Sequence, residues 1–485
     1  MTLGPSSRFC IWLALCVACP ASWLDAQNPS ASQPAANPGS LAPELLQQLE
    51  AIKSAALQDD YAYRQLAHLT ENIGPRPTGS AAASAAVEYV AAEMRDLGLE
   101  VHLEECNVRH WTRGAETAEL VDYAGRAAGV QQKIVLTALG GSTSTGATGI
   151  TADIIVVDDF DHLKALRREG VDGKIVLFNR RFDKEQATAG LGFKSYRETV
   201  DYREKGAQAA GQLGAVAALV RSIGGADYRL PHTGDSIPAG IPSAAVSAED
   251  AELVSHLASQ GPVRMHLTLT PQKLPDETSY NVIGDLRGSE HPEQIVIVSG
   301  HLDSWDLGTG AIDDAAGVVI AMETAQLVRQ LHLHPKRTLR VVAWMDEETD
   351  GAGSAKYRKE HQSEFSNHVA AIESDMGAGR PLGFFAKMSK AAIDALSPLQ
   401  TTLGSIGASV IQQASHPPGI TDIDPISEEG VPLLGIMQDT RTYYNYHHSA
   451  ADTLDKVVPT ELRENVAAMA IMAYALTEMK NPLPR

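Results

Sequence analysis

A stretch between two apolar segments carries an unusual concentration of acidic side chains. Residues 299–317 read SGHLDSWDLGTGAIDDAAG and place one histidine and four aspartates between a predicted strand and a predicted helix. Carboxylates that lie this close together repel one another and are costly to remove from water. Either water solvates all of them, or something positive lies among them.

Similar groups follow three further apolar segments nearer the C-terminus. Asp346, Glu347 and Glu348 come directly after LRVVAWM, Asp375 comes directly after AAIES, and YHHSAADT comes a few residues after VPLLGIMQD. In open α/β sheets, ligands bind beyond the carboxyl ends of the strands. These groups should therefore converge at one edge of a sheet, where divalent metal ions would offset their repulsion.

Each of these residues also has an ordinary structural explanation. Asp313 alone fits the N-cap of the helix that it precedes. Glu347 and Glu348 alone fit a solvated strand end, and His301 alone fits a hydrogen-bonded core histidine. The occurrence of imidazole or carboxylate groups at several strand ends of one sheet is what favours a metal site.

The ligand types indicate which metal would bind. Imidazole and carboxylate groups without thiolate suit zinc, with manganese or cobalt as alternatives. The sequence contains no HExxH motif, which excludes the single-zinc helix that this motif forms. The carboxylates are more than one zinc ion needs, and two ions that share a bridging aspartate would use them. We therefore expect two Zn²⁺ per chain.

The apolar pattern predicts the elements that position these groups. From about residue 276, continuous apolar strands alternate with helices, and PTELRENVAAMAIMAYALTEM closes the chain as an amphipathic helix. This pattern predicts an α/β fold with a mostly parallel sheet and helices on both faces. The middle third has short apolar runs between Gly/Ser/Pro stretches, which suggests a small α+β or β-rich module. We expect one domain from 43–118 and 276–485, with 119–275 inserted into it.

Length and charge limit the possible partners. The 485 residues are too many for one compact core, which indicates at least two domains. The formal net charge of −20 argues against nucleic acid and anionic membranes as partners. Oligomeric state cannot be derived from these patterns.

The first residues predict export. Residues 1–26 combine a basic residue, an apolar segment too short to span a bilayer and a plausible cleavage point, which is typical of a signal peptide; a membrane anchor is the alternative. Residues 27–42 read as a flexible leader. Three of the four cysteines lie in the signal, so the mature chain would keep only Cys106 and no internal disulfide. We expect a periplasmic or extracellular protein without an integral membrane segment in the mature chain.

The motifs resemble those of a known family. SGHLDSWDLGTGAIDDAAG, WMDEET, IESDMG and HHSAADT are similar to the metal-site motifs of the secreted co-catalytic di-zinc exopeptidases. IGPRPTGS, GKIVLFN, LVRSI, PHTG and PKRTLR extend the resemblance, in the same order, over nearly the whole chain after the signal. The resemblance implies a protease-associated domain within the insert, which would cover the cleft or shape substrate access, and it suggests a homodimer.

The resemblance also implies the metal ligands. His301 is expected to bind one zinc ion, with Asp375 on the same side. Asp313 is expected to bridge both ions. Glu348 is expected to bind the ion opposite His301, and His448 is expected to be the remaining histidine ligand.

Catalytic roles follow from the same resemblance. Glu347 is expected to act as the general base that takes a proton from a metal-bridging water and later passes it to the leaving amine. Asp303 is expected to orient the His301 imidazole through its carboxylate. His447 falls where related enzymes have a tyrosine near the oxyanion, so it is expected to donate a hydrogen bond to the tetrahedral intermediate. Family members often have a cis peptide bond after the residue that corresponds to Asp313.

Two ligand assignments depend on the resemblance because each candidate has an identical neighbour. Asp313 and Asp314 are adjacent, and the family pattern selects the first. His447 and His448 are adjacent, and the pattern selects the residue next to Ser449.

Three further acidic residues lie near these motifs. Asp346 stands where the family often has a smaller or neutral residue, so its charge would either lower the acidity of metal-bound water or repel acidic substrates. Asp422 and Asp424 lie in SHPPGITDIDP, a candidate pocket loop in which an acid would hold a free amine. An ordinary turn is the alternative for that loop.

The sequence therefore predicts a secreted zinc exopeptidase that hydrolyses dipeptides or short peptides. Carboxypeptidase, aminopeptidase and dipeptidase activities stay open, because they differ in which terminus the pocket captures. A catalytically inactive binding protein on the same scaffold is an alternative, which the complete ligand set and Glu347 disfavour. A serine hydrolase ranks lower still, because the sequence has no GxSxG elbow.

Overall fold

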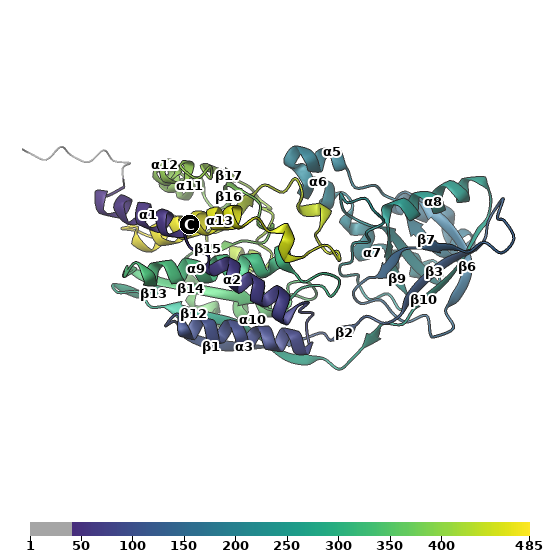
Figure 1. Ribbon diagram of the computed structural model, residues 1–485, viewed down its shortest axis with the longest axis horizontal. Helices are drawn as coiled ribbons and strands as arrows, with labels where there is room; N and C mark the ends of the chain where they lie inside the picture. Colours follow the sequence, from purple (N-terminus) through teal and green to yellow (C-terminus); the bar gives the residue numbers. More distant parts are fainter. Residues whose placement is uncertain (1–40) are drawn as a thin grey trace, which may run out of the picture. The chain divides into compact units, whose positions relative to one another are not determined.

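The computed structural model describes residues 41–485 of the chain (Figure 1). The predicted signal peptide, residues 1–26, and most of the predicted leader, residues 27–42, lie outside the described residues. Within residues 41–485, the strands form two eight-stranded sheets and a two-stranded ribbon. No helix in this part of the chain is both long enough and apolar enough to cross a membrane.

The first sheet carries the predicted alternation of strands and helices. Its strand order is β1-β12-β14-β13-β15-β18-β16-β17. The strands β14, β13, β15 and β18 run parallel to one another at its centre, while β12 and β16 are antiparallel to their central neighbours. The bounds are β1 (Glu100–Val108), β12 (Glu277–Leu286), β13 (His291–His301), β14 (Arg337–Trp344), β15 (His368–Glu373), β16 (Pro381–Lys387), β17 (Val410–Gln413) and β18 (Leu433–Gln438).

Helices cover both faces of this sheet, which confirms the predicted α/β fold. The larger core lies between the sheet and α1 (Pro43–Ala56), α2 (Tyr61–Ala67), α3 (Ala81–Asp96), α9 (Ala316–Gln330) and α13 (Pro459–Glu478). A smaller core on the other face includes residues of α10 (Ala352–Glu360), η4 (Gln362–Asn367) and η6 (Asp424–Glu429).

The closing helix α13 differs from the amphipathic helix that the sequence predicts. Its residues 465–477 are all buried, because α1, α9 and the sheet surround it. A helix that is apolar on all sides is stable only where other elements enclose it. The polar residues that suggested an exposed face lie in its first turns.

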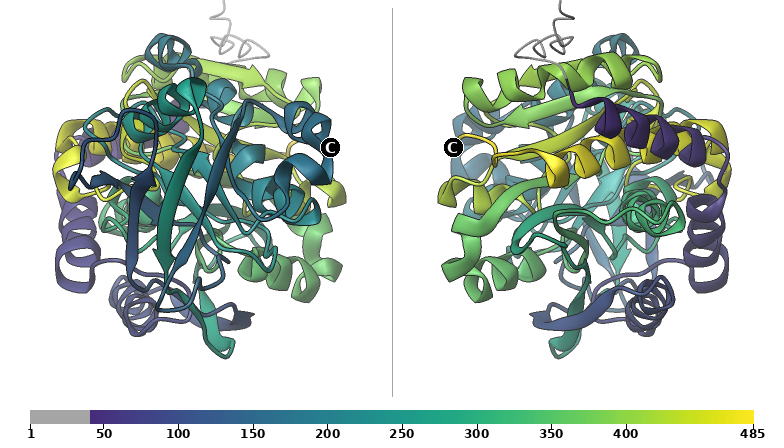
Figure 2. Two further views of the ribbon diagram at one scale, coloured as in Figure 1. Left: turned by 90° about the vertical axis from the view of Figure 1, so that its right-hand side faces the viewer. Right: turned by 90° about the vertical axis from the view of Figure 1, so that its left-hand side faces the viewer.

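The second sheet is also mixed and has its own cores. Its order is β4-β3-β10-β6-β7-β8-β9-β5, with β6 to β9 parallel to one another. The left view of Figure 2 looks onto the region of this sheet. The strands are β3 (Glu116–Asp122), β4 (Gln132–Ile134), β5 (Leu136–Ala138), β6 (Ile150–Val157), β7 (Ile175–Phe178), β8 (Ala217–Arg221), β9 (Ser243–Val246) and β10 (Val263–Leu269). One core includes α4 (Phe160–Val171) and α7 (Val200–Gln212), and the other includes α8 (Ala248–Gln260).

Two chain segments join the sheets. They pair with each other as β2 (Trp111–Thr112) and β11 (Gln272–Lys273), antiparallel, before the chain enters β3 and after it leaves β10. Three short helical segments, α5 (Lys184–Gln186), η2 (Ala187–Leu191) and α6 (Gly192–Arg197), lie between β7 and α7.

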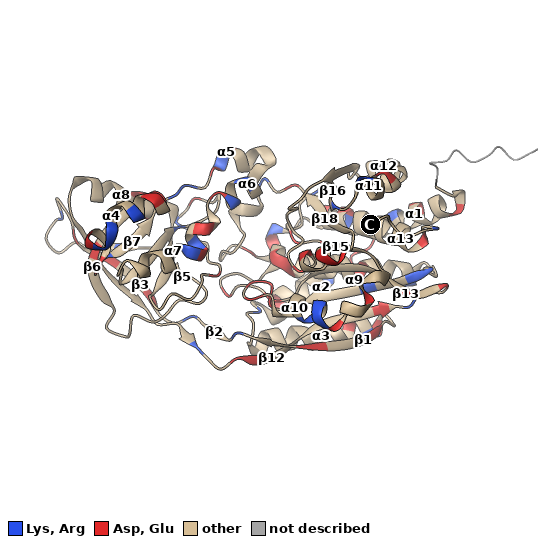
Figure 3. Ribbon diagram, turned by 180° about the vertical axis from the view of Figure 1, so that it is seen from behind, with Lys and Arg blue, Asp and Glu red and all other residues tan. Residues whose placement is uncertain are grey.

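The register of the first sheet brings three strand ends together. His301 at the end of β13 is paired with Trp344 at the end of β14, and Ser299 of β13 is paired with Glu373 at the end of β15. Parallel strands in this register end at the same edge, so the loops that follow them meet there. Figure 3 shows acidic segments in the loops around β15.

Candidate metal centre and active site

The strand ends bring the predicted acidic and histidine side chains together. His301 is the last residue of β13, Glu347 and Glu348 lie in the turn after β14, and Asp375 lies two residues beyond β15. Asp313 comes from η3 (Ala311–Ala315), immediately before α9. Five separate backbone positions at one sheet edge thus present titratable groups to one region.

Asp313 lies at the centre of this group, because its two carboxylate oxygens face different residues. Oδ1 lies 3.1 Å from Nε2 of His301, whose Nε2 is in turn 3.6 Å from Oδ1 of Asp375. Oδ2 lies 3.2 Å from Nε2 of His448, which is 2.9 Å from Oε2 of Glu348. The carboxylate therefore separates a His301–Asp375 side from a His448–Glu348 side.

The residues fit divalent metal ions. One donor atom each from His301, Asp313 and Asp375 lies within 4.8 Å of the others, and the same holds for Asp313, His447 and His448. Among the described residues, the buried oxygens Oδ2 of Asp313 and Oε1 of Glu348 have no hydrogen-bond partner. Buried polar atoms in folded proteins almost always have a partner, and a cation would supply one here.

Electrostatics supports the same conclusion. Burial raises the pKa of Glu347 well above its usual range; His301 opposes this shift, and the charges of Asp375 and Glu348 reinforce it. Burial also acts to raise the pKa of Asp313, but the hydrogen bond with His301 and the neighbouring histidines hold that pKa well below its usual range. The carboxylates outnumber the imidazoles, so added positive charge would stabilise the cluster.

The backbone around Asp313 turns its side chain away from the helix that follows. The peptide bond between Asp313 and Asp314 is cis, as the resemblance implies. The carboxylate of Asp314, rather than that of Asp313, accepts hydrogen bonds from the N–H of Gly317 at 3.0 Å and of His301 at 3.1 Å. Asp314 therefore caps α9, because the Asp313 side chain is turned toward the histidines. A Cβ on Gly317 would lie 1.9 Å from the Ser374 carbonyl oxygen, so only glycine allows this close approach.

Asp303 also acts differently from the prediction. Nδ1 of His301 lies 3.1 Å from the backbone carbonyl oxygen of Asp303 and 3.9 Å from its carboxylate. The carboxylate instead accepts hydrogen bonds from the N–H groups of Asp346, Glu347 and Glu348, at 2.8, 3.2 and 3.3 Å. The carbonyl orients the imidazole, and the carboxylate holds the turn that carries the two glutamates.

Glu347 and Asp346 face different surroundings. The Glu347 side chain is 16% exposed, lines the cavity and lies 3.9 Å from Nε2 of His301. The buried Asp346 carboxylate accepts hydrogen bonds from the Thr349 hydroxyl and from Ala352 N–H at the start of α10. Burial, followed by the charge of Asp303, raises the pKa of Asp346 to about 7. The charge of Asp346 is thus directed at a helix start rather than at the cavity.

The predicted substrate contacts of Asp422 and Asp424 are not supported. Asp424 forms an ion pair with Lys387 at 2.6 Å, and Asp422 is 2% exposed, with burial and the charge of Glu373 raising its pKa well above its usual range. Neither lines the cavity, whereas Gly419 and Thr421 of the same loop do. The residues of this loop that line the cavity are therefore a glycine and a threonine rather than the two aspartates.

A cavity of about 460 Å³ adjoins the acidic cluster. Helices and loops that follow strands of both sheets form its walls. From the first sheet come residues of the cluster itself together with Met376 and Tyr443. From the region of the second sheet come Phe193, Tyr196, Arg203, Glu204, Asp235 and Ile237.

Arg203 on α7 is a cavity residue that sequence reasoning missed. It is 6% exposed, its Nη1 lies 3.3 Å from Nδ1 of His448, and its Nε has no hydrogen-bond partner among the described residues. The carboxylate of Glu204 is 3.8 Å away, beyond hydrogen-bond distance. In the sequence Arg203 belongs to a charged helical segment, VDYREKGAQAAGQ, in which it has no feature that separates it from surface charges.

His447 has two possible roles. Its ring stacks on that of His448 with centroids 3.7 Å apart, and its Nε2 lies 3.4 Å from Oδ2 of Asp313. It also lines the cavity. The structure thus places it beside the metal-binding group as well as beside the space for substrate.

The histidine-bearing turn is held by a segment of the second sheet region that sequence reasoning also missed. Thr233 N–H donates to the His448 carbonyl at 2.8 Å, and Nδ1 of His232 lies 2.7 Å from the His447 carbonyl oxygen. The PHTG motif that contains both residues was noted only as part of the resemblance, and it gives no indication of what it contacts.

Comparison with known proteins identifies the family of the chain. The model of Peptidase family M28 matches residues 281–473. Carboxypeptidase Q of Homo sapiens is 36% identical over 431 residues, which cover 87% of this chain and 87% of that protein. The protein of the same name from Mus musculus is 35% identical over 446 residues, 90% of each chain.

Solved structures show the same relationship. The crystal structure of a Peptidase M28 precursor from Shewanella amazonensis has a TM-score of 0.85 at 33% identity and covers 91% of this chain and 98% of its own. A zinc aminopeptidase from Bacillus subtilis has a TM-score of 0.64 at 21% identity, covers 86% and 94%, and shares the fold.

The chain therefore belongs to peptidase family M28, and it is a metallo-exopeptidase. Within that family it is carboxypeptidase Q-like. The family resemblance found in the sequence motifs is confirmed.

Proposed function

We propose that the protein is a zinc-dependent carboxypeptidase that hydrolyses dipeptides or short peptides. The observation that carries this proposal is the buried guanidinium of Arg203, which lines the cavity beside the acidic cluster with no carboxylate of the described residues within hydrogen-bond distance. A second candidate, an aminopeptidase, is favoured by the Glu204 carboxylate in the same cavity, because a carboxylate there could hold a free amine.

The metal centre would hold two Zn²⁺ per chain. His301, Asp313 and Asp375 would hold one ion, and Asp313, Glu348 and His448 the other, because these sets lie on the two sides of the Asp313 carboxylate. Polarisation of a carbonyl group and acidification of water are the chemistry that such a centre supplies.

Glu347 would move the protons. Its carboxylate lines the cavity and lies at the edge of the His301 side, where Oε2 can accept a proton from the attacking water. The same oxygen can then give that proton to the leaving amine. Its backbone N–H is held by the Asp303 carboxylate, which limits the movement of the side chain.

Arg203 would bind the free carboxylate of the substrate. A guanidinium pairs with a carboxylate through two parallel hydrogen bonds, and such pairs are strongest where water is excluded. With two divalent ions bound among the acidic groups, Arg203 would be a further positive charge beside them. On the wall that carries Arg203, the Asp235 carboxylate is already paired with Arg109 at 2.8 Å.

A substrate series tests the proposal directly. The zinc-loaded protein is incubated with one dipeptide as the free, N-acetylated and C-amidated forms, and cleavage is followed by mass spectrometry. A carboxypeptidase hydrolyses the free and N-acetylated forms, an aminopeptidase the free and C-amidated forms, and a dipeptidase only the free form. No cleavage of any form with two metals bound would favour a binding protein on this scaffold.

An Arg203 variant makes the test specific. We expect Arg203→Gln to raise KM for the free-carboxylate substrates by about 10- to 100-fold, since a charge-assisted pair contributes about 1.5–3 kcal/mol. Lys390, an exposed residue whose side chain pairs with Asp394, offers the matched control Lys390→Gln. An unchanged KM in Arg203→Gln would remove the basis for choosing the carboxypeptidase.

The remaining predictions about the chain complete the proposal. We propose that residues 119–275 form a protease-associated domain inserted into the peptidase domain of 43–118 and 276–485, and that it closes one wall of the cavity. We propose export to the periplasm or the exterior on the strength of residues 1–26, which lie outside the described residues.

A further inference from the structure

The turn that carries His448 is paired with a segment of the second sheet region. Thr233 N–H donates to the His448 carbonyl oxygen at 2.8 Å, and a β-bridge joins His232 to Ser449. Nδ1 of His232 lies 2.7 Å from the His447 carbonyl oxygen. These contacts hold three consecutive residues of the turn from one side.

The same segment orients the His448 ring. Nδ1 of His448 lies 3.3 Å from the Thr233 carbonyl oxygen. Nη1 of Arg203 lies at the same distance of 3.3 Å from Nδ1, so this ring nitrogen lies between a carbonyl oxygen and a guanidinium. Nε2 of the same ring faces Asp313 at 3.2 Å and Glu348 at 2.9 Å, so it is the nitrogen that would face a metal ion held by these carboxylates.

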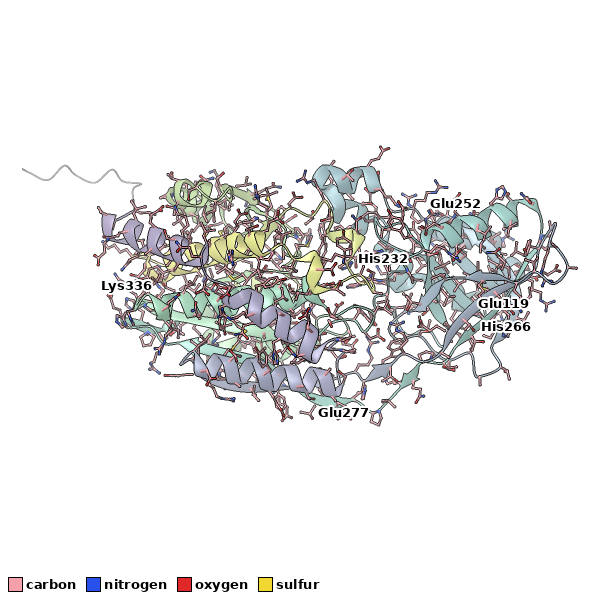
Figure 4. The ribbon with its side chains drawn as sticks, viewed as in Figure 1. Glu119, His232, Glu252, His266, Glu277 and Lys336 are labelled. Atoms are coloured by element: carbon pink, nitrogen blue, oxygen red, sulfur yellow. The ribbon has the colours of Figure 1, made fainter. Side chains whose placement is uncertain are left out.

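His232 is itself rigidly placed. It is 3% exposed, its backbone N–H donates to the Ser222 hydroxyl at 3.1 Å just after β8, and Gly224 packs against its ring. Figure 4 labels His232 at the end of the second sheet region that lies beside the C-terminal segment. Because the His447 carbonyl only accepts, Nδ1 of His232 is the donor, and burial lowers the pKa of His232 to about 4, so the ring stays neutral.

The backbone of the turn needs such support. His448 has a φ of 58°, in the left-handed region that residues other than glycine rarely adopt. A non-glycine residue keeps this conformation only where surrounding contacts hold it. Within the turn itself, Ser449 N–H donates to the Tyr446 carbonyl, and the two bonds to the carbonyls of 447 and 448 come from the second sheet region.

We propose that His232 and Thr233 are positioning residues that hold His448 in the conformation required of a metal ligand. The metal position on the His448 side is then complete only while this segment of the second sheet region is docked on the turn. The inference rests on the proposed function in one respect, which is that His448 binds metal.

Substitutions at His232 distinguish the effect of its hydrogen bond from the effect of its side-chain volume. His232→Asn keeps a nitrogen donor at the same number of bonds from Cβ as Nδ1, whereas His232→Leu keeps most of the volume without a donor. The matched control is His266→Leu, because His266 lies on β10 of the same region, away from the turn (Figure 4), and pairs with Thr151. Zinc affinity is measured by competition with a chelator, together with zinc content per chain.

The expected result is a loss confined to one metal position. Removing a group that orients a ligand typically weakens metal binding by about 10- to 100-fold. We therefore expect His232→Leu to weaken zinc binding on the His448 side by that factor and to leave zinc binding on the His301 side unchanged. The zinc affinity of His232→Asn should remain within about 3-fold of wild type, well short of that loss. The zinc affinity of His266→Leu should equal that of wild type.

The outcomes distinguish this inference from the proposed function. If the wild-type protein binds fewer than two zinc ions, the proposed metal centre is wrong. If the wild type binds two ions and His232→Leu binds both as tightly, the positioning role is wrong. Should His232→Leu fail to fold, as judged by its thermal transition, His232→Gln replaces it, because its donor lies one bond further from Cβ. Equal affinity in the Asn and Gln variants would then overturn the inference.

Discussion

The two histidines that flank Asp313 are held in different ways. Nδ1 of His301 contacts the backbone carbonyl of Asp303, two residues away in the same loop. Nδ1 of His448 contacts the carbonyl of Thr233, which is separated from it by 215 residues in the chain. Both contacts place the same kind of acceptor behind the ring, but one is local and the other comes from the second sheet region.

This difference shows how the site divides. The His301 side is built from the ends of β13 and β15 and the loop between β13 and α9, so the first sheet suffices to form it. The His448 side needs the second sheet region as well, and so does the wall of the cavity that carries Arg203. Changes in the first sheet should therefore affect both sides, whereas changes in the second should affect one.

The largest effect is expected where the two sides meet. Asp313→Ala removes the carboxylate that faces both histidines, so zinc content should fall on both sides and turnover should drop by roughly 10³-fold or more, as when groups that act as a unit lose a common member. Zinc content and kcat are measured together. Retention of one tightly bound zinc would show that Asp313 does not join the two sides.

Glu347 should affect neither side of the metal centre. Glu347→Gln keeps the shape of the side chain but removes its ability to accept a proton, so kcat should fall by about 10²- to 10⁴-fold while zinc content stays at the wild-type level. The neighbouring Glu348→Gln serves as the comparison, because it should lower zinc content. Near-normal turnover in Glu347→Gln would rule out its role as the base.

The Asp303 carboxylate should affect activity through the turn after β14, because it holds that turn in place. Asp303→Asn removes the charge that three backbone N–H groups share, so the turn carrying Glu347 and Glu348 loosens. We expect kcat to fall by about 10-fold, at the lower end of losses for groups that support metal ligands. Because the carbonyl of Asp303 remains, zinc on the His301 side should stay bound, and its loss would contradict the distinction between carbonyl and carboxylate.

The smallest effect is expected at Asp424. Its carboxylate is half-exposed and pairs with Lys387 outside the cavity, so Asp424→Asn should change kcat/KM by less than about 2-fold, as exposed ion pairs contribute about 1 kcal/mol or less to stability. Kinetic constants on the free dipeptide provide the measurement. A large rise in KM would show that Asp424 contacts the substrate.

Much of the fold could be predicted because its signal is local. Apolar strands alternating with helices after residue 276 indicated a mostly parallel sheet, and the polar residues at strand ends indicated one functional edge. The same local pattern was wrong about α13, because the sequence of a helix does not show how many elements will surround it. It could not show which of the two adjacent aspartates caps α9, because Asp313 and Asp314 are identical in type and differ only in the direction of their side chains.

By itself, the sequence determined the types of groups at the site and their order along the chain, since ligand chemistry depends on residue type and strand ends follow from periodicity. Only the tertiary structure decided which atoms of those residues meet. It directed the Asp303 carboxylate to backbone N–H groups, turned Asp424 outward, and brought Arg203 and Thr233 to His448. The physical reason is that hydrogen bonds and ion pairs act over about 3–4 Å, so they depend on side-chain direction and on long-range packing that no local pattern records.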